Sequence, residues 1–220
     1  MKFKEMSSQI QKYLSEDRAV FVSSSFQTHS IPLLHMISRI SPEVPVAFLN
    51  TGFLFPETLE FRDQVLDRLG LELLEVTSSI PKSQQRDPAG RFFFHSDPDR
   101  CCNMNKVQPM EELLWQYDVW INGVRADQSA QRKSFDIEQP TPQRAIRFHP
   151  MLAWTSRMIH EYRVEHNLPE HPLEAQGYFS VGCEPCTQCM TAEGGRDGRW
   201  FGQKKTECGL HMDLVAPKKK

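Results

Sequence analysis

The cysteines of this chain are spaced so that metal ligands are separated from a reactive thiol. Cys101 and Cys102 are adjacent, and Cys183 and Cys186 form a C-x-x-C pair about eighty residues later. Adjacent cysteines reach disulfide geometry only with strain. Four thiolates that arrive as two pairs can instead surround one soft metal centre, and both iron–sulfur clusters and structural zinc are held by thiolates. We therefore expect these four cysteines to be metal ligands, of either kind of centre.

Cys208 stands apart from both pairs, in the segment Glu207-Cys208-Gly209-Leu210-His211. This glycine-flanked, polar setting is unlike that of a buried structural cysteine. Cationic neighbours lower the pKa of a thiol and enrich its nucleophilic thiolate form. We expect Cys208 to be reactive, the alternative being a surface thiol without function. The basic side chains that precede it are Arg196, Arg199, Lys204 and Lys205.

Two further segments have the residue types of an anion site. The loop 23–30 is rich in hydroxyls (Ser23, Ser24, Ser25, Thr28, Ser30) and lies between an apolar strand and a helical pattern, where backbone N–H groups and the helix dipole favour anions. It lacks the glycines and lysine of a Walker loop, and its serines can alternatively serve as helix caps. Asn50-Thr51-Gly52 ends the next expected strand, and two such loops side by side favour a nucleotide.

An arginine-bearing segment follows the fourth expected strand. Arg125 and Arg132 lie within Gly123–Arg132, and their planar guanidinium groups suit phosphate or sulfate oxygens. On an exposed loop the same arginines are more often simply solvated. The position of the segment, after a strand, favours a role at the ligand-binding edge of the sheet.

The apolar pattern predicts a set of alternating strands and helices. We expect strands at about 19–22, 44–49, 71–76 and 119–121, and helices at about 4–17, 31–37, 56–69, 101–117 and 155–165, with Pro109 as a start or kink. Residues 77–100 are predicted to form a loop or lid, and 130–146 a polar excursion. Such alternation indicates an α/β fold, a mostly parallel sheet with helices on both faces, whose ligands bind beyond the carboxyl ends of the strands.

Composition narrows the class of protein. The chain has 220 residues, 39% hydrophobic and 25% charged, which suits one α/β domain with a small appendage. Its net charge of -2 is not that of a general nucleic-acid binder. No apolar run reaches the ~18 residues of a membrane span, and the N-terminus has no signal-like apolar region. We therefore expect a cytoplasmic protein, in which cysteines serve metal or redox chemistry more than disulfides.

Taken together, six segments resemble the thioredoxin-dependent sulfonucleotide reductases of assimilatory sulfate reduction, in order over about residues 19–212. The Glu-Cys-Gly-Leu-His end is the most distinctive. The resemblance implies a PP-loop, adenine nucleotide alpha hydrolase-like fold. The segments are the Ser23-Ser24-Ser25-Phe26 loop, the stretch 49–58, Lys106–Met110, Gly123–Arg132, Gly177–Gly182 and Glu207–His211.

One branch of this family reduces 3′-phosphoadenylyl sulfate and lacks the paired cysteines. The other carries Cys-Cys and Cys-x-x-Cys around a 4Fe–4S cluster and mainly reduces adenylyl sulfate. Cys101, Cys102, Cys183 and Cys186 match the second branch, so adenylyl sulfate is the expected substrate and 3′-phosphoadenylyl sulfate the alternative. The segments 52–58 and 201–204 resemble the cluster-free branch equally well.

The family mechanism implies that Cys208 attacks the sulfur of the bound phosphosulfate, that AMP leaves, and that thioredoxin (or glutaredoxin) releases sulfite from the resulting S-sulfocysteine. By the same resemblance, Lys106, Arg196, Arg199 and His211 join Cys208 as catalytic residues. The cluster is implied to tune the site and not to deliver electrons. The implied substrate-binding residues are Ser23, Ser24, Ser25, Ser30, Thr51, Gly52, Arg125, Gln128 and Arg132.

The sequence departs from the family at two informative positions. Asn50 stands where relatives usually have Asp, which removes a charge near the nucleotide. Cys189 extends the second pair to a ferredoxin-like triplet. Cys189 can replace one of the adjacent cysteines as a ligand, act as an extra redox thiol, or be neutral, and the neutral reading is favoured.

Three rival functions use some of the same residues. A zinc-stapled nucleotide-binding protein needs the four paired cysteines but leaves Cys208 idle. A PP-loop ATP pyrophosphatase relative normally carries Ser-Gly-Gly-x-Asp-Ser, which is absent here. A disulfide-bonded binding domain is disfavoured by the missing signal peptide.

We expect residues 1–193 to form the nucleotide-binding reductase domain and 194–220 to be a mobile catalytic tail.

Overall fold

The computed structural model describes residues 1–189, 198–199 and 207–215. Within these residues the strands form one six-stranded sheet in the order β3-β2-β1-β4-β6-β5, parallel except for β5, which runs antiparallel to β6. The sequence prediction of a mostly parallel α/β fold is confirmed. The strands are β1 (Val20–Ser23), β2 (Val46–Asn50), β3 (Leu73–Thr77), β4 (Val119–Asn122), β5 (Glu138–Pro140) and β6 (Ile146–Phe148).

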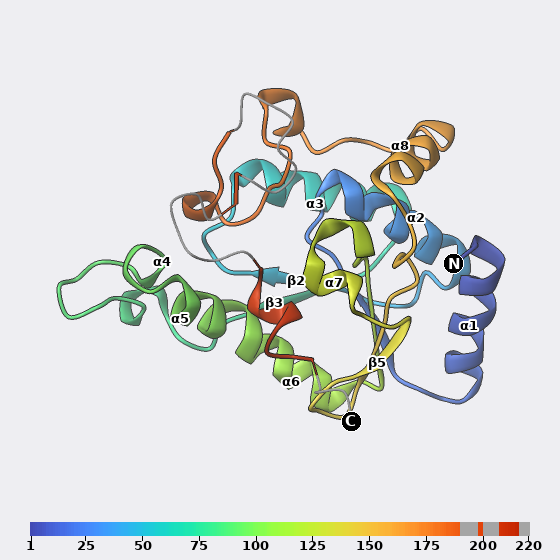
Figure 1. Ribbon diagram of the computed structural model, residues 1–220, viewed down its shortest axis with the longest axis horizontal. Helices are drawn as coiled ribbons and strands as arrows, with labels where there is room; N and C mark the ends of the chain where they lie inside the picture. Colours follow the sequence, from blue (N-terminus) through green and yellow to red (C-terminus); the bar gives the residue numbers. More distant parts are fainter. Residues whose placement is uncertain (190–197, 200–206, 216–220) are drawn as a thin grey trace.

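Helices pack on both faces of the sheet (Figure 1). One face is covered by α1, α2, α3 and α8, and the other by α6 together with the end of the described chain. The helices are α1 (Phe3–Ser15), α2 (Ile31–Ile40), α3 (Pro56–Leu69), α4 (Phe93–Ser96), α5 (Pro98–Cys102), α6 (Gln108–Gln116), α7 (Ala130–Lys133) and α8 (Ser156–Glu165).

The two-layer packing follows from the alternation of side chains along the central strands. In β1, Val20 and Val22 pack into the core cluster beneath α1 and α2, whereas Phe21 points to the opposite cluster and stacks on Trp120. Successive strand residues point to opposite faces, so a strand covered on both sides is apolar throughout. This is why the short apolar runs identified four of the six strands.

The expected helix over 101–117 is divided by a π-helical turn. α5 ends at Cys102, the π-helical turn occupies Asn103–Val107, and α6 begins at Gln108 with Pro109 in its first turn. Proline has no N–H to donate and is tolerated at this position, so the start predicted at Pro109 is confirmed to within a residue. π-Helical turns are frequent at functional sites, and this one carries Lys106.

Two expectations differ from the structure in detail. Part of the predicted polar excursion 130–146 forms β5 and the beginning of β6, which are only three residues each and too short to show a period-two pattern. The predicted loop 77–100 includes α4 and the start of α5. Both differences lie in short elements, whose stability comes from tertiary packing more than from local propensity.

The described end of the chain packs against the sheet. Leu214 is fully buried in the cluster that contains Val107 and Met110. Gly209 sits so close to the π-helical turn that a Cβ there would lie 2.8 Å from Cγ2 of Val107. Residues 207–215 are therefore docked beside Lys106. The mobile tail predicted over 194–220 stays a prediction, since within it the structure describes only residues 198–199 and 207–215.

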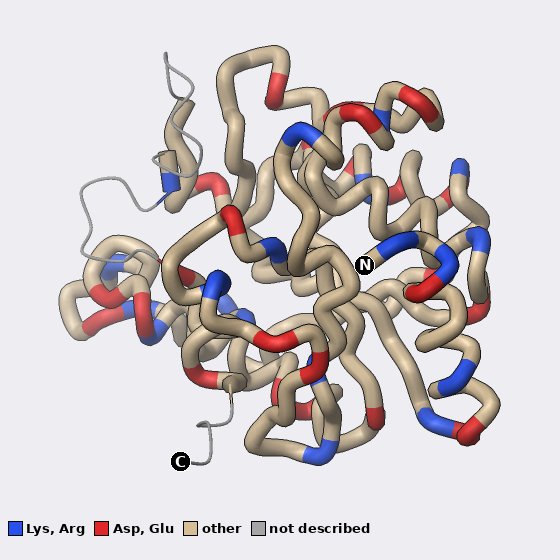
Figure 2. The backbone as a smooth tube through the Cα atoms, turned by 45° about the vertical axis from the view of Figure 1, so that its right-hand side comes forward, with Lys and Arg blue, Asp and Glu red and all other residues tan. Residues whose placement is uncertain are grey.

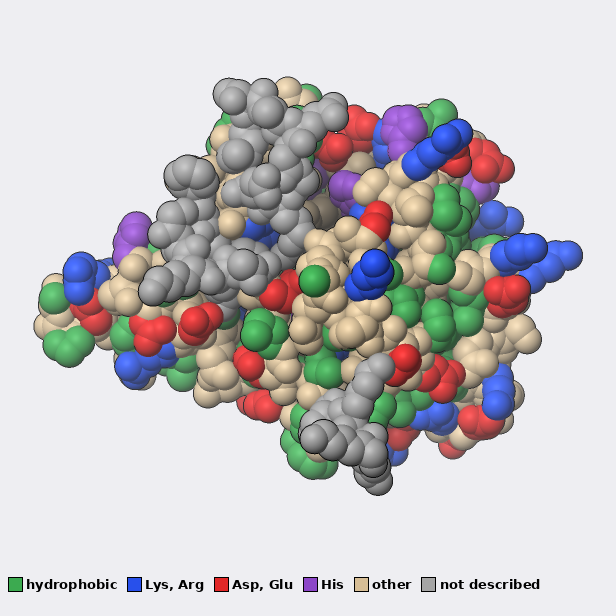
Figure 3. All heavy atoms as spheres, in the orientation of Figure 1, with side chains coloured by type: hydrophobic (Ala, Val, Ile, Leu, Met, Phe, Trp, Pro, Cys, Tyr) green, Lys and Arg blue, Asp and Glu red, His purple; other side chains and the backbone are tan. Residues whose placement is uncertain are grey.

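Basic and acidic residues are interspersed along the described chain (Figure 2), and neither sign gathers on the face drawn in Figure 3. No helix in the described ranges has the length and apolar character needed to cross a membrane.

Candidate active site

A cavity of about 470 Å³ opens at the carboxyl ends of β1, β2 and β4. This is the edge of a parallel sheet at which ligands bind in α/β folds. The cavity brings together four parts of the chain. They are the serine loop (residues 23–30), the arginine segment (Gly123–Arg132), the π-helical turn (Asn103–Val107) and the docked segment (residues 207–215). Of the sequence-predicted residues it is lined by Ser23, Ser24, Ser25, Ser30, Lys106, Arg125, Gln128, Arg132, Cys183, Arg199, Cys208 and His211.

The serine loop is held in shape by its own hydroxyl groups. Phe26 has a left-handed φ of 52° and a fully buried side chain, and its N–H donates to Oγ of Ser24 at 3.0 Å. A bulky residue in the left-handed region is strained and persists only where the surroundings fix it. The hydroxyl of Ser23 accepts a hydrogen bond from the indole of Trp120 at 2.7 Å. The loop is thus rigid before any ligand arrives.

Cys208 and Lys106 meet at this cavity. Burial opposes the charged form of Lys106, but the thiolates of Cys183, Cys208 and Cys102 outweigh burial and raise the pKa of Lys106. Lys106 therefore remains an ammonium ion at neutral pH, surrounded by thiol groups. A cation placed beside a cysteine favours its thiolate form, which is the form required for nucleophilic attack.

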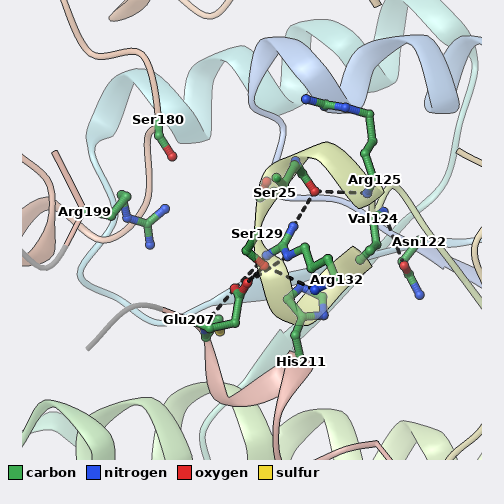
Figure 4. A network of polar contacts seen from close by, with 12 residues as sticks. Ser25, Asn122, Val124, Arg125, Ser129, Arg132, Ser180, Arg199, Glu207 and His211 are labelled. Carbon is green, nitrogen blue, oxygen red and sulfur yellow. Dashed lines mark hydrogen bonds and ion pairs between the residues drawn. The ribbon is translucent and has the colours of Figure 1, made fainter. Parts of the chain in front are cut away.

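Arg199 enters the cavity from the side opposite to Arg132, alongside Ser180 (Figure 4). One guanidinium N–H donates to the carbonyl of Val181 at 3.1 Å. The group crosses directly over Gly182, where a Cβ would lie 2.3 Å from the guanidinium carbon. Glycine at 182 is therefore a packing requirement for the position of Arg199.

Arg132, predicted to contact the substrate, lines the cavity and also pairs with Glu207. Its Nε and Nη2 form two parallel bonds to the carboxylate of Glu207, at 2.9 and 2.7 Å, and both side chains are buried. Ser129 also donates to Glu207, at 3.0 Å (Figure 4). These bonds make Arg132 an anchor for the residue that precedes Cys208, and its substrate contact stays a prediction. Gln128 supports the anchor by accepting a hydrogen bond from Arg132.

Arg125 is a second buried arginine at the cavity wall. Its Nε donates to Asp127 at 3.0 Å and its Nη2 to Ser156 at 3.1 Å, whereas Nη1 has no hydrogen-bond partner within the described structure. Burial lowers the pKa of Arg125, and the Asp127 carboxylate opposes that effect. An unpartnered N–H at a cavity wall is suited to an anionic or hydroxylated ligand.

The four paired cysteines form no disulfide bond, and they lie close enough for their charges to interact. Burial and the other three thiolates raise the pKa of Cys101 to about 12, and burial together with Cys183 raises that of Cys186 to about 11. Burial also opposes ionisation of Cys183, but Lys106 and the Thr51 hydroxyl, 3.3 Å away, lower its pKa overall.

No group of three or more His, Cys, Asp or Glu side chains has metal-binding geometry in the described ranges. The four paired cysteines nevertheless have the ligand type of an iron–sulfur cluster, because four soft thiols from two segments are brought together. Cys101 also receives an N–H···S contact of 3.6 Å from Asn105. Cys189 is exposed, and its thiol donates to the carbonyl of Gln176 at 3.1 Å.

Some predicted residues lie elsewhere. Thr51 contacts the Cys183 thiol, and Gly52, with φ of 69°, accepts a hydrogen bond from Lys82, so neither lines the cavity. Asn50 donates to Glu75 at 3.1 Å. Arg196 lies outside the described residues.

The structure also adds residues that the sequence reasoning did not identify. Glu207 holds the docked segment through its bonds to Arg132, and Arg147 contacts the same segment at His211. A charged residue that the sequence places between apolar neighbours in β6 was the only available signal for Arg147.

The family model and the most similar curated proteins both indicate a sulfonucleotide reductase family. Residues 19–189 match the phosphoadenosine phosphosulfate reductase domain. An adenosine 5′-phosphosulfate reductase of Chelativorans sp. is 40% identical over 201 residues, covering 90% of this chain and 80% of that protein. A phosphoadenosine 5′-phosphosulfate reductase of Gloeobacter violaceus is 40% identical over 196 residues, covering 86% and 81%.

Solved structures share the fold. A phosphoadenylyl-sulfate reductase of Candida auris superposes with a TM-score of 0.68 at 19% identity, covering 81% of this chain and 87% of that one. An FMN adenylyltransferase of Candida glabrata gives 0.57 at 15% identity, covering 78% and 57%.

Proposed function

Since the chain belongs to the phosphoadenosine phosphosulfate reductase family, we propose that it reduces adenylyl sulfate to sulfite and AMP with Cys208 as the nucleophile. The observation that carries the proposal is the meeting of Cys208, Lys106, Arg199 and His211 at one cavity beyond the carboxyl ends of the strands. Relatives about 40% identical over most of the chain carry the name adenosine 5′-phosphosulfate reductase.

The proposed reaction has two thiol-dependent steps. The Cys208 thiolate attacks the sulfonate sulfur, the bond from that sulfur to the phosphate oxygen breaks, and AMP leaves with the electron pair, so that Cys208 carries an S-sulfo group. A thiolate of thioredoxin (or glutaredoxin) then attacks the Cys208 sulfur, and sulfite leaves with the electron pair. The second partner thiol resolves the mixed disulfide, and the dithiol supplies both electrons.

Anionic reactants require cations at the reacting centre. Lys106 is held beside Cys208 by the thiolates around it, and Arg199 lies over Gly182 on the opposite wall. Preorganised cations of this kind stabilise charge that develops on the transferring group and on the leaving phosphate. Arg196 is proposed as a further phosphosulfate contact on the basis of sequence alone, as are Thr51 and Gly52 for the nucleotide.

Cys101, Cys102, Cys183 and Cys186 would hold a 4Fe–4S cluster. When bound, the cluster supplies electrostatic tuning of the site. What supports this assignment is the donor type, the absence of disulfide bonds among these cysteines and the influence of each charge on the others. Lys106 interacts electrostatically with both groups of thiols, because the charges of Cys102 and Cys183 and the charge of Cys208 all raise its pKa.

Single serine variants test the ligand assignment. Cys101→Ser and Cys186→Ser are expected to lose the visible chromophore and the bound iron. Cys189→Ser is the matched control and is expected to keep both, because Cys189 is exposed and bonded to Gln176. Loss of the chromophore in Cys189→Ser would contradict the four-cysteine assignment, and a colourless wild type containing zinc would support the zinc-stapled alternative.

The second candidate substrate is 3′-phosphoadenylyl sulfate. It is favoured by the Gloeobacter relative of the same identity, whose name is phosphoadenosine 5′-phosphosulfate reductase. Anaerobically purified protein should be assayed for sulfite release with thioredoxin and each nucleotide, while iron content and absorbance are recorded. We expect brown protein, preference for adenylyl sulfate, and no sulfite from Cys208→Ser. A colourless protein that prefers the 3′-phosphorylated nucleotide would overturn the choice of substrate and cofactor.

The proposal that the partner is thioredoxin and that the reaction takes place in the cytoplasm rests on the family resemblance. It is supported by the absence of disulfide bonds among the cysteines, which suits a reducing compartment.

A further inference from the structure

Arg147, in the middle of β6, is a cation with no exposed surface. Its guanidinium carbon lies 4.8 Å from the ring centroid of Trp120 and 5.0 Å from that of Phe135, so two aromatic side chains fix its position. Burial lowers the pKa of Arg147 to about 9, which keeps the group charged at neutral pH. A buried guanidinium of this kind is expected to make a directed hydrogen bond.

That directed bond goes to the chain end that carries Cys208. Nη2 of Arg147 lies 2.9 Å from Nδ1 of His211, whereas Nε and Nη1 have no hydrogen-bond partner in the described structure. His211 lines the same cavity as Cys208 and Lys106. Among the described residues, the hydrogen bond to His211 is the polar contact that links Arg147 to the candidate active site.

The chemistry of the two groups decides the direction of the bond. Arginine has donors and no acceptor, so Nδ1 of His211 must accept and cannot carry a proton. The neutral ring then has its proton on Nε2. A second proton would have to replace the bond from Arg147 and would place two cations in contact within a buried site.

We propose that Arg147 is a positioning residue that fixes His211 as the neutral Nε2–H tautomer, so that His211 is a hydrogen-bond donor to the anionic substrate and not a base for Cys208. The inference rests on the proposed function for its catalytic meaning, but the tautomer itself is a property of the free protein. It follows that the ring of His211 has no nitrogen free to take the proton of Cys208.

The charged groups around His211 act in both directions. Glu207 and Asp213 from its own segment, and Asp127 in the same cavity, favour a second proton on the ring. Arg147, which contacts the ring, opposes it, as do the cavity-lining cations Lys106, Arg125, Arg132 and Arg199. Arg132 already neutralises Glu207. The direct contact with Arg147 is thus the feature that separates the two tautomers.

Nitrogen NMR of holoprotein with ¹⁵N-labelled histidine tests the tautomer without any substrate. The His211 signals are assigned by their loss in His211→Asn. We expect an unprotonated nitrogen at Nδ1 and an N–H at Nε2, unchanged from pH 8 to pH 6, a window that includes the ordinary histidine pKa of about 6.5. A proton on Nδ1 of the wild type, or a ring that ionises near that value, would overturn the proposal.

Variants at 147 separate a positioning role from a structural one. Arg147→Met removes the donor, and we expect mixed tautomers and ionisation of His211 near the ordinary value. Arg147→Lys keeps a donor and should keep the wild-type tautomer. The control is Arg144→Met, which removes an exposed arginine that is paired with Asp118. If Arg147→Met does not fold, the wild-type and Arg147→Lys spectra decide the question.

Activity gives a separate readout. Loss of a hydrogen bond that involves a charged group typically lowers activity by roughly ten- to hundredfold, so sulfite release by Arg147→Met should fall by about that factor and recover in Arg147→Lys. A wild-type tautomer as proposed without sulfite release would contradict the proposed function alone. Sulfite release with a protonated Nδ1 would contradict this inference alone.

Discussion

Gly182 and Arg199 form the most direct structural dependence at the candidate site. The guanidinium occupies the space in which any side chain at 182 would begin, with its carbon 2.3 Å from the position of a Cβ. The flexible end of the Arg199 side chain can move away from such a clash at small cost in free energy. We therefore expect the fold to tolerate alanine at 182, while the guanidinium of Arg199 is displaced from its position. This separation between stability and position makes the pair experimentally useful.

Gly182→Ala is expected to displace Arg199 while leaving the melting temperature close to that of the wild type. The KM for the sulfonucleotide should rise by roughly ten- to hundredfold, the usual cost of a lost hydrogen bond to a charged group. Arg199→Ala should have a similar effect, and the double variant should be no worse than either single variant, because both remove the same contact. Steady-state kinetics on the four proteins checks this. Additive losses would contradict the shared mechanism.

At the scale of elements, the buried ion pair between α7 and the docked segment 207–215 controls where Cys208 lies. Arg132 contributes two hydrogen bonds to Glu207, and the pair is nearly inaccessible to solvent. Removal of one partner of a buried pair leaves an uncompensated charge and typically costs about 3–5 kcal/mol. Replacement of both partners by apolar side chains avoids that cost.

Arg132→Met should therefore release the segment 207–215, and alkylation of Cys208 should become at least about tenfold faster, which corresponds to roughly 1.4 kcal/mol of lost docking free energy. The double variant Arg132→Met/Glu207→Leu should alkylate at a rate close to that of the wild type. The alkylation rates should be measured with iodoacetamide at a pH above the pKa of the thiol, so that a change in the thiolate fraction cannot explain a change in rate. An unchanged rate in Arg132→Met would show that the pair does not hold the segment.

The strands that the sequence predicted are longer than the strands that it missed. β1 and β4 are apolar on both faces, so short runs such as Val20-Phe21-Val22 identified them without structural information. β6 has the same buried character but contains Arg147, and its three residues give no period to recognise. Short elements of this kind are specified by contacts that are distant in sequence.

The same distinction holds at the site. Cys208 and Lys106 were predicted from residue type, motif and resemblance, and the structure brings them to one cavity. The involvement of Arg132 with Glu207 and of Arg147 with His211 depends on pairings across more than sixty residues. Residue type, position after a strand and the family resemblance predicted a substrate contact for Arg132, but they could not predict its pairing with Glu207, because an arginine suits a carboxylate and a sulfate equally well.

For the whole molecule, buried neutral histidines link folding to pH. His171 is almost fully buried, its Nδ1 accepts from the N–H of Leu173, and its Nε2 lies 3.0 Å from the Thr58 hydroxyl. Burial lowers the pKa of His171 to about 4, which Glu57 slightly opposes. His149 is fully buried, and burial together with Arg147 lowers its pKa to about 3.

Because these folded-state values lie below the unfolded value of about 6.5, the unfolded chain binds more protons between pH 6.5 and pH 4, and stability is lost as the pH falls through that window. Each group should contribute a loss of about 2 kcal/mol between pH 7 and pH 5. In urea titrations of the holoprotein, His171→Gln should be less stable than the wild type at pH 7, yet lose about 2 kcal/mol less on acidification. The exposed His160→Gln is the control and should follow the wild type. If His171→Gln loses as much as the wild type between pH 7 and pH 5, then His171 is not the proton-binding group, and the acid sensitivity of the fold must come from other residues.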